Sequence, residues 1–170
     1  MDDALLRAAG RTFDLLVVGG GVFGAGAARE AALNGWSVCL AERGDLGEET
    51  SSRSSKLLHG GLRYLERGDF ALVRESLRER AGTARLGPHL ARPLPFLAPV
   101  YRGARVGPLK LRAGLFLYDL LARPPADMRR GFLDADDALR AEPRLRPAGL
   151  RGAGRYFDYQ TFDSRLTAEI

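Results

Sequence analysis

Three glycines near the N-terminus have the spacing needed to hold the phosphates of a dinucleotide. They lie in the order Gly19-x-Gly21-x-x-Gly24, after a short apolar segment and before a segment rich in small residues. In a dinucleotide fingerprint the first glycine permits a tight turn, the second lets the backbone approach a pyrophosphate, and the third lets the helix pack closely on the strand. The free N–H groups of the first helical turn would then face the phosphates.

Glu42 is the second chemical signal, because it ends the next apolar segment, eighteen residues after Gly24. A carboxylate at this spacing accepts hydrogen bonds from a ribose diol and repels a 2′-phosphate, which disfavours NADP. A glycine turn alone also occurs in proteins that bind no ligand. The order of strand, helix, second strand and acid therefore carries the prediction of a dinucleotide-binding unit.

A loop rich in hydroxyl groups is the third signal. It places hydroxyls, backbone N–H groups and a lysine within seven residues, Thr50-Ser-Ser-Arg-Ser-Ser-Lys56. Such a loop can donate hydrogen bonds to phosphates and ring edges without steric bulk. A solvated serine loop has the same composition, and composition alone slightly favours that interpretation.

The elements that would position these residues predict an α/β fold. Apolar strands over 12–18 and 37–42 flank a helix over 22–34, and the first strand is apolar enough for burial on both faces. A loop covers 44–55. Beyond it we expect a helix over 70–86 capped by Asp69, an extended piece at 96–98, a helix from Pro108 that includes 109–121, a short helix capped by Asp134, a strand at 154–159 and a helix opened by Asp163.

Two of these helices have an informative pattern of apolar residues. In the helix over 70–86 one face is expected to pack in the core, namely Phe70, Val73, Leu77, Ala81 and Ala84. The helix that begins at Pro108 is too short and too charged to span a membrane. It could lie on a membrane surface, but packing in the interior is the favoured interpretation.

Composition sets the broad class of the protein. The chain has 170 residues, 45% hydrophobic and 28% charged, which is typical of a globular protein. The net charge of +5 is compatible with an anionic partner, but no basic run of the nucleic-acid type occurs, so we expect no nucleic acid partner. Cys39, the single cysteine, is expected to be a buried small hydrophobe, and no metal site is expected.

The N-terminal residues and the hydropathy bear on localisation. Residues 1–11 are expected to form a short leader, helical in one interpretation, and they lack the basic start and apolar core of a signal peptide. No apolar run is long enough to span a bilayer. We therefore expect the protein in the cytoplasm or on the inner face of the cell membrane.

A doubly wound sheet needs more than two parallel strands, and no second strand–helix–strand unit follows Glu42. The chain also ends inside an expected helix. We therefore interpret the chain as the front part of a longer protein. Residues 1–90 would begin a dinucleotide-binding, Rossmann-like domain, and residues 91–170 would begin a second, substrate-binding or cap region.

Several stretches together resemble the FAD-dependent glycerol-3-phosphate dehydrogenases, within the D-amino-acid-oxidase-like flavoproteins. The most specific is the run from Thr50-Ser-Ser to Leu58-His-Gly-Gly-Leu-Arg-Tyr-Leu65. The fingerprint Leu16-Val-Val-Gly-Gly-Gly with Gly24-Ala-Gly26 is the second. Scattered matches continue through Arg74-Glu75, Pro88-His89-Leu90, Arg92-Pro93-Leu94, 114–119 and 156–166.

The resemblance implies a reaction and its partners. Such enzymes oxidise sn-glycerol 3-phosphate to dihydroxyacetone phosphate, with hydride transfer to FAD and electron transfer to a quinone. The implied class is thus a quinone-linked flavoprotein of glycerol metabolism. The resemblance also allows peripheral membrane association and a homodimer.

The resemblance also assigns roles to individual positions. Gly19, Gly21 and Gly24 would hold the FAD pyrophosphate, and Glu42 the adenosine ribose. Arg63 and Tyr64 would reach the substrate, because arginine offers a planar fork to a phosphate and tyrosine a directional O–H. The middle of the cofactor would be lined by Thr50, Ser51, Ser52, Ser55 and Lys56, and the flavin would be contacted by His59, Gly60 and Gly61.

Some features leave alternatives open. Phe23 stands where the resembled family often has asparagine, which would alter cofactor packing or the substrate class. A related flavoenzyme acting on an amine or a 2-hydroxy acid is one alternative. A non-catalytic, truncated FAD-binding fragment is another. No residue is assigned as general base, since His59 and His89 are the only histidines and nothing indicates a proton-transfer role for either.

Overall fold

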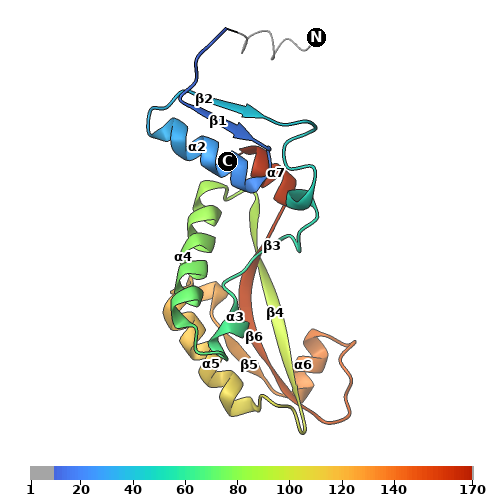
Figure 1. Cartoon of the computed structure of the whole chain (residues 1–170). Helices are drawn as coiled ribbons and strands as arrows, with labels where there is room; N and C mark the ends of the chain where they lie inside the picture. Colours follow the sequence, from blue (N-terminus) through green and yellow to red (C-terminus); the bar gives the residue numbers. More distant parts are fainter. Residues whose placement is uncertain (1–9, 170) are drawn as a thin grey trace. The chain divides into compact units, whose positions relative to one another are not determined.

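The computed structural model describes residues 10–169 (Figure 1). The chain divides into two compact units, one made of residues up to Lys56 together with Thr161 onward, and one made of Leu57–Gln160. We call them the N-terminal unit and the inserted unit. Most of the expected leader, residues 1–9, lies outside the described residues.

The N-terminal unit contains the predicted strand–helix–strand motif. Strand β1 (Leu15–Val18), helix α2 (Val22–Leu33) and strand β2 (Val38–Ala41) follow one another, and β1 pairs with β2 in parallel, from Leu15↔Val38 to Val18↔Ala41. The short helix η1 (Thr50–Ser52) and helix α7 (Asp163–Glu169) complete the unit. This arrangement confirms the Rossmann-like α/β prediction.

Strand β1 differs from the prediction in its burial. We expected both of its faces to be covered, but the side chains alternate, with Leu16 61% and Val18 81% exposed. In the described part of the chain β1 pairs only with β2, and these two side chains lie largely uncovered. Cys39 on β2 is half-buried rather than buried.

The inserted unit is a four-stranded sheet with helices. Strand β6 (Leu150–Thr161) pairs with β3 (Leu57–Leu58), β4 (Ala91–Tyr101) and β5 (Gly131–Leu133), and its pairing with β3 and β5 is antiparallel. In Figure 1, α4 and α5 run along one side of this sheet. The remaining elements of this unit are the helices α3 (Leu62–Leu65), α4 (Phe70–Leu86), α5 (Pro108–Ala122), η2 (Ala126–Met128) and α6 (Ala135–Ala141).

The core of this unit forms where α4 and α5 pack together. Val73 and Leu77 of α4 and Tyr118 of α5 are at most 2% exposed, and Tyr64, Leu65 and Tyr156 are among the half-buried side chains around them. Burial of Val73 and Leu77 confirms the predicted apolar face. The prediction that Phe70 packs in the core is wrong, because this side chain is 50% exposed at the first turn of α4. Helix α5 buries Leu115 and Tyr118 yet exposes Leu109, Phe116 and Leu120, so it packs with only one face.

The predicted helix starts are confirmed more closely than the strands. The carboxylates of Asp69 and Asp134 accept hydrogen bonds from Leu72 N and Asp137 N, as N-caps do. The extended piece expected at 96–98 belongs to the eleven-residue strand β4, and the strand expected at 154–159 belongs to the twelve-residue β6. Strands β3 and β5 and helix α3 were not expected, since each has four residues or fewer and carries no periodic pattern.

Candidate functional site

The glycine turn between β1 and α2 has the geometry that the fingerprint predicts. Gly19 has a φ of +104°, a conformation that side chains rarely adopt. A Cβ at Gly24 would overlap the carbonyl oxygen of Gly19 and lie 3.3 Å from Val17 Cγ1. Helix α2 can therefore approach the end of β1 closely only because residue 24 is glycine, and its N-terminus follows the turn directly.

Glu42 contacts this turn directly. One of its carboxylate oxygens accepts a hydrogen bond from Gly20 N at 2.6 Å, and the other accepts from Arg43 N at 2.6 Å and Gly44 N at 3.1 Å. The hydrogen bond from Gly20, followed by those from Gly44 and Arg43, holds the pKa of Glu42 below its usual value. The group is thus a carboxylate at neutral pH, and it joins the end of β2 to the glycine turn.

The serine-rich loop also reaches the start of α2. Ser51 Oγ accepts a hydrogen bond from Val22 N, the first residue of the helix, at 2.9 Å, and lies 3.3 Å from a Cβ built at Gly21. Thr50 and Ser52 lie with Ser51 in η1, where the Ser52 hydroxyl donates to Gly47 O. The loop therefore borders the helix N-terminus, where a phosphate would bind.

The other end of the loop is held by the start of α7. Ser54 Oγ donates to Asp163 Oδ2 at 2.8 Å and accepts from Lys56 N at 2.9 Å. Thr161 N donates to Lys56 O at 2.9 Å, and Lys56 has a φ of +56°, which is uncommon for a side-chain-bearing residue. Ser55 lies exposed between these anchors.

This anchor leads to a prediction for Asp163→Asn. Burial raises the pKa of Asp163, but hydrogen bonds from Ser54 and Ser164 outweigh it and leave the pKa below 3.8. A carboxyl with a lowered pKa contributes stability above its unfolded pKa and loses it as pH falls through the folded one. We expect the wild type to lose about 1 kcal/mol of unfolding free energy below about pH 4. The Asp163→Asn variant should not show this pH-dependent loss.

Urea unfolding between pH 3 and 7 measures this dependence. Asp45→Asn removes an exposed carboxylate of the same unit and is the control. Parallel pH profiles of the wild type and Asp163→Asn would show that the contact with Ser54 contributes nothing.

The motif residues from His59 to Tyr64 lie in the inserted unit. Gly60 is buried, and its N–H faces Tyr118 Oη at 3.0 Å and Asp158 Oδ1 at 3.2 Å. Gly61, with a φ of +70°, is the N-cap of α3. Arg63 is exposed, whereas the ring of Tyr64 is half-buried against the α4–α5 core.

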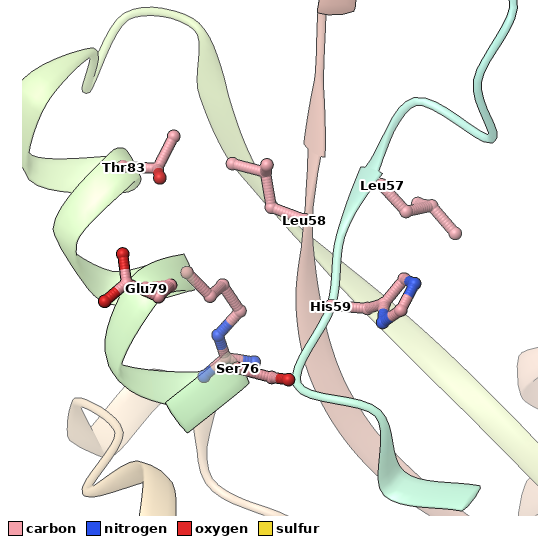
Figure 2. A pocket seen from close by; sticks show the side chains of 7 residues that line it. Leu57, Leu58, His59, Ser76, Glu79 and Thr83 are labelled. Atoms are coloured by element: carbon pink, nitrogen blue, oxygen red, sulfur yellow. The ribbon is translucent and has the colours of Figure 1, made fainter. Parts of the chain in front are cut away.

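Two pockets of the inserted unit border this motif. Figure 2 shows the smaller, of about 310 Å³, lined by Leu58 and by α4 residues that include Arg80. Leu58 points toward α4 there, while His59 points away from it. The larger pocket, of about 550 Å³, is mostly apolar and is bordered by Arg63, Lys110 and Tyr156.

The structure brings the predicted residues together in two groups. The glycine turn, Glu42 and Ser51 are linked by hydrogen bonds within the N-terminal unit, and His59 to Tyr64 form the turn after β3 and the start of α3 in the inserted unit. Sequence reasoning missed the hydrogen bonding of Ser54 to Asp163 and the buried group Arg80, Tyr118 and Asp158. Helical spacing could have indicated Arg80, since it lies seven residues after the buried Val73 on the same face.

These features fit the pyrophosphate of a dinucleotide, because the turn has no Cβ in the way and the helix N-terminus is close behind it. The chain belongs to the FAD dependent oxidoreductase family, whose model matches residues 14–169. Among the residues that the structure describes, no group of side chains is suited to a metal ion. No helix in the described part of the chain has the length and apolarity to cross a membrane.

Within that family the chain is similar to aerobic glycerol-3-phosphate dehydrogenases. It is 43% identical over 160 residues to that of Bacillus subtilis (strain 168), and 43% identical over 158 residues to that of Staphylococcus saprophyticus. These alignments cover 94% and 93% of this chain but only 29% and 28% of the relatives. The chain thus spans less than a third of the length of these relatives.

Solved structures show the same fold. The glycerol-3-phosphate dehydrogenase from Bacillus halodurans, complexed with FAD, superposes with a TM-score of 0.68 at 30% identity, over 98% of this chain and 25% of that one. The L-alpha-glycerophosphate oxidase from Mycoplasma pneumoniae, with FAD bound, has a TM-score of 0.65 at 17% identity, over 93% of this chain and 41% of that one. The second likeness shows the fold alone.

Proposed function

We propose that this chain forms the first part of the FAD site of an enzyme that oxidises sn-glycerol 3-phosphate to dihydroxyacetone phosphate. The observation that carries the proposal is the glycine turn, joined to Glu42 and Ser51 by hydrogen bonds from Gly20 N and Val22 N. Similarity to glycerol-3-phosphate dehydrogenases supports the substrate. When bound, the flavin would supply the hydride acceptor, and the protein would bind and orient the substrate.

The residue roles follow the two groups. We propose that the N-terminal unit holds the dinucleotide, and that the inserted unit begins the substrate region, which puts the boundaries near residues 56 and 161 rather than at 90. Within the first unit the cofactor contacts would be Gly19, Gly21, Gly24, Glu42, Thr50, Ser51, Ser52, Ser55 and Lys56. Within the second, His59, Gly60 and Gly61 would meet the flavin, and Arg63 and Tyr64 the substrate.

The partners are part of the same proposal. A quinone would receive the electrons, and the protein would act at the inner face of the cell membrane, as a peripheral protein and as a homodimer. The net charge of +5 supports attraction to anionic lipid.

Titration with FAD of the full-length protein that contains this chain, and of the chain alone, followed by anaerobic addition of candidate substrates, tests the proposal. We expect stoichiometric FAD and bleaching of the flavin by sn-glycerol 3-phosphate, but none by glycerol. Bleaching by an amine or a 2-hydroxy acid would identify a different oxidoreductase of the family. Bound FAD that no substrate reduces would identify a FAD-binding fragment without activity.

Arg63→Ala tests the substrate role separately. The exposed guanidinium is free to form a charge-assisted pair with a phosphate, an interaction worth about 1.5–3 kcal/mol. We therefore expect the KM for sn-glycerol 3-phosphate to rise about 10- to 150-fold in steady-state assays of the FAD-loaded protein. Arg67→Ala, which removes an exposed arginine in the turn after α3, is the control. An unchanged KM in Arg63→Ala would remove Arg63 from the substrate site.

A further inference from the structure

A buried hydrogen-bond network holds the backbone of the His59–Gly61 segment in the inserted unit. Gly60 N lies 3.0 Å from Tyr118 Oη and 3.2 Å from Asp158 Oδ1. Tyr118 O–H donates to the same Asp158 oxygen at 2.7 Å, and Arg80 Nη1 donates to it at 2.5 Å. One carboxylate on β6 therefore joins α4 and α5 to the turn after β3.

The side chains of the network are buried. The side chains of Arg80 and Asp158 are each 6% exposed, and Tyr118 is 1% exposed. Arg80 Nη1 also donates to Phe157 O at 3.0 Å, and its guanidinium lies 5.9 Å and 5.5 Å from the ring centres of Tyr118 and Tyr159. Apolar side chains of similar volume often stabilise a core as well as a buried ion pair does, so the Arg80–Asp158 pair is weak evidence for a purely stabilising role.

The position of Gly60 shows what the network acts on. A Cβ at Gly60 would overlap Leu77 Cδ2 and lie 2.5 Å from Tyr118 Oη, so the absence of a side chain lets the segment pack against the core. Gly61 then adopts its left-handed conformation and begins α3. The segment is thus fixed on its α4 side, while the side chain of His59 points away from α4 (Figure 2).

Burial, and then the neighbouring charge of Asp158, raise the pKa of Tyr118 above its usual range. The phenol therefore keeps its proton at any working pH and donates it to Asp158. Its oxygen lone pairs remain available to accept from Gly60 N.

We propose that Asp158, with Tyr118, is a positioning residue that fixes the backbone of His59–Gly61 for contact with the flavin. This inference rests on the proposed function, in which that segment meets the isoalloxazine. Neither side chain touches the cofactor in this scheme. Their effect passes through the Gly60 amide.

Asp158→Asn and Tyr118→Phe in the FAD-loaded protein test the inference. We expect the Gly60 amide to exchange with solvent about 10- to 100-fold faster, as loss of one or two buried hydrogen bonds implies. FAD stoichiometry should stay the same, because the pyrophosphate residues lie in the other unit. The flavin absorption spectrum and midpoint potential should shift, and kcat should fall more than KM rises.

Asp119→Asn is the matched control. It disturbs the ion pair between Asp119 on α5 and Arg130, whose nearest charged atoms are 3.5 Å apart. This pair is not part of the network around Gly60. We expect it to leave the Gly60 exchange and the flavin spectrum unchanged. Equal effects in all three variants would show that the network contributes only to general stability, and would overturn the inference.

Different results would overturn the inference about Asp158 and Tyr118 and the proposed function. Folded, FAD-loaded Asp158→Asn and Tyr118→Phe proteins with wild-type spectra and potentials would overturn the inference alone. If Asp158→Asn does not fold, the milder Tyr118→Phe decides. A wild-type protein that takes up no FAD would overturn the proposed function and the inference with it.

Discussion

Replacement of Arg80 by methionine is expected to lower the unfolding free energy of the inserted unit by about 3–5 kcal/mol. The variant leaves the carboxylate of Asp158 buried, 6% exposed, without its charged partner. It also removes the hydrogen bond to Phe157 O. Urea unfolding followed by circular dichroism, with hydrogen exchange to localise the effect, measures this loss.

The same helix supplies the control for this experiment. Arg78→Met removes an exposed arginine two residues earlier, and we expect it to change stability by less than about 0.5 kcal/mol. The double variant Arg80→Met, Asp158→Leu should recover part of the loss, because it removes both buried charges. A loss below about 1 kcal/mol in Arg80→Met would mean that Asp158 is well solvated or protonated without its partner.

Gly24→Val is expected to abolish retention of FAD. Its side chain would overlap Gly19 O and contact Val17, so α2 would have to move away from the end of β1. The glycine turn and the first N–H groups of the helix would then lose their common geometry. We expect the affinity for FAD to fall on the order of 100-fold or more, measured by titration monitored through flavin fluorescence.

Gly26→Ala is the matched variant, two residues further along α2. A Cβ at Gly26 meets no atom within 4 Å, and alanine favours a helix over glycine by about 1 kcal/mol. FAD affinity should therefore equal or exceed that of the wild type. Wild-type flavin content in Gly24→Val would contradict the assignment of the glycine turn to the pyrophosphate.

The sequence predicted the nucleotide-binding motif because its signals are local. The spacing of Gly19 and Gly24 and the position of Glu42 depend on a turn and two short strands that are consecutive in the chain. The caps at Asp69 and Asp134 are equally local, since each carboxylate bonds an N–H three residues away. Such features need no knowledge of the tertiary fold.

The features that sequence reasoning missed depend on pairing across long separations. Asp158 meets Gly60 only after β6 lies beside β3, and it meets Arg80 of α4 across a separation of 78 residues. Nothing near these residues in the sequence indicates either contact. Strand β4 was underestimated because Pro93, Pro95 and Pro99 fall inside it, although proline removes only the donor and its φ is compatible with extended backbone. The burial of β1 was overestimated because a continuous apolar run does not show whether covering elements are present.

The connections between the two units have a consequence for how this fold tolerates change. The chain leaves the N-terminal unit after Lys56 and returns at Thr161, and these two residues share a hydrogen bond of 2.9 Å. Within the inserted unit, its first residue, Leu57, pairs with its last residue, Gln160. The inserted unit thus has adjacent ends, so residues can be added or removed within it without changing the distance that the flanking chain must span. This modularity makes the N-terminal unit a scaffold onto which inserted units of different size can be grafted.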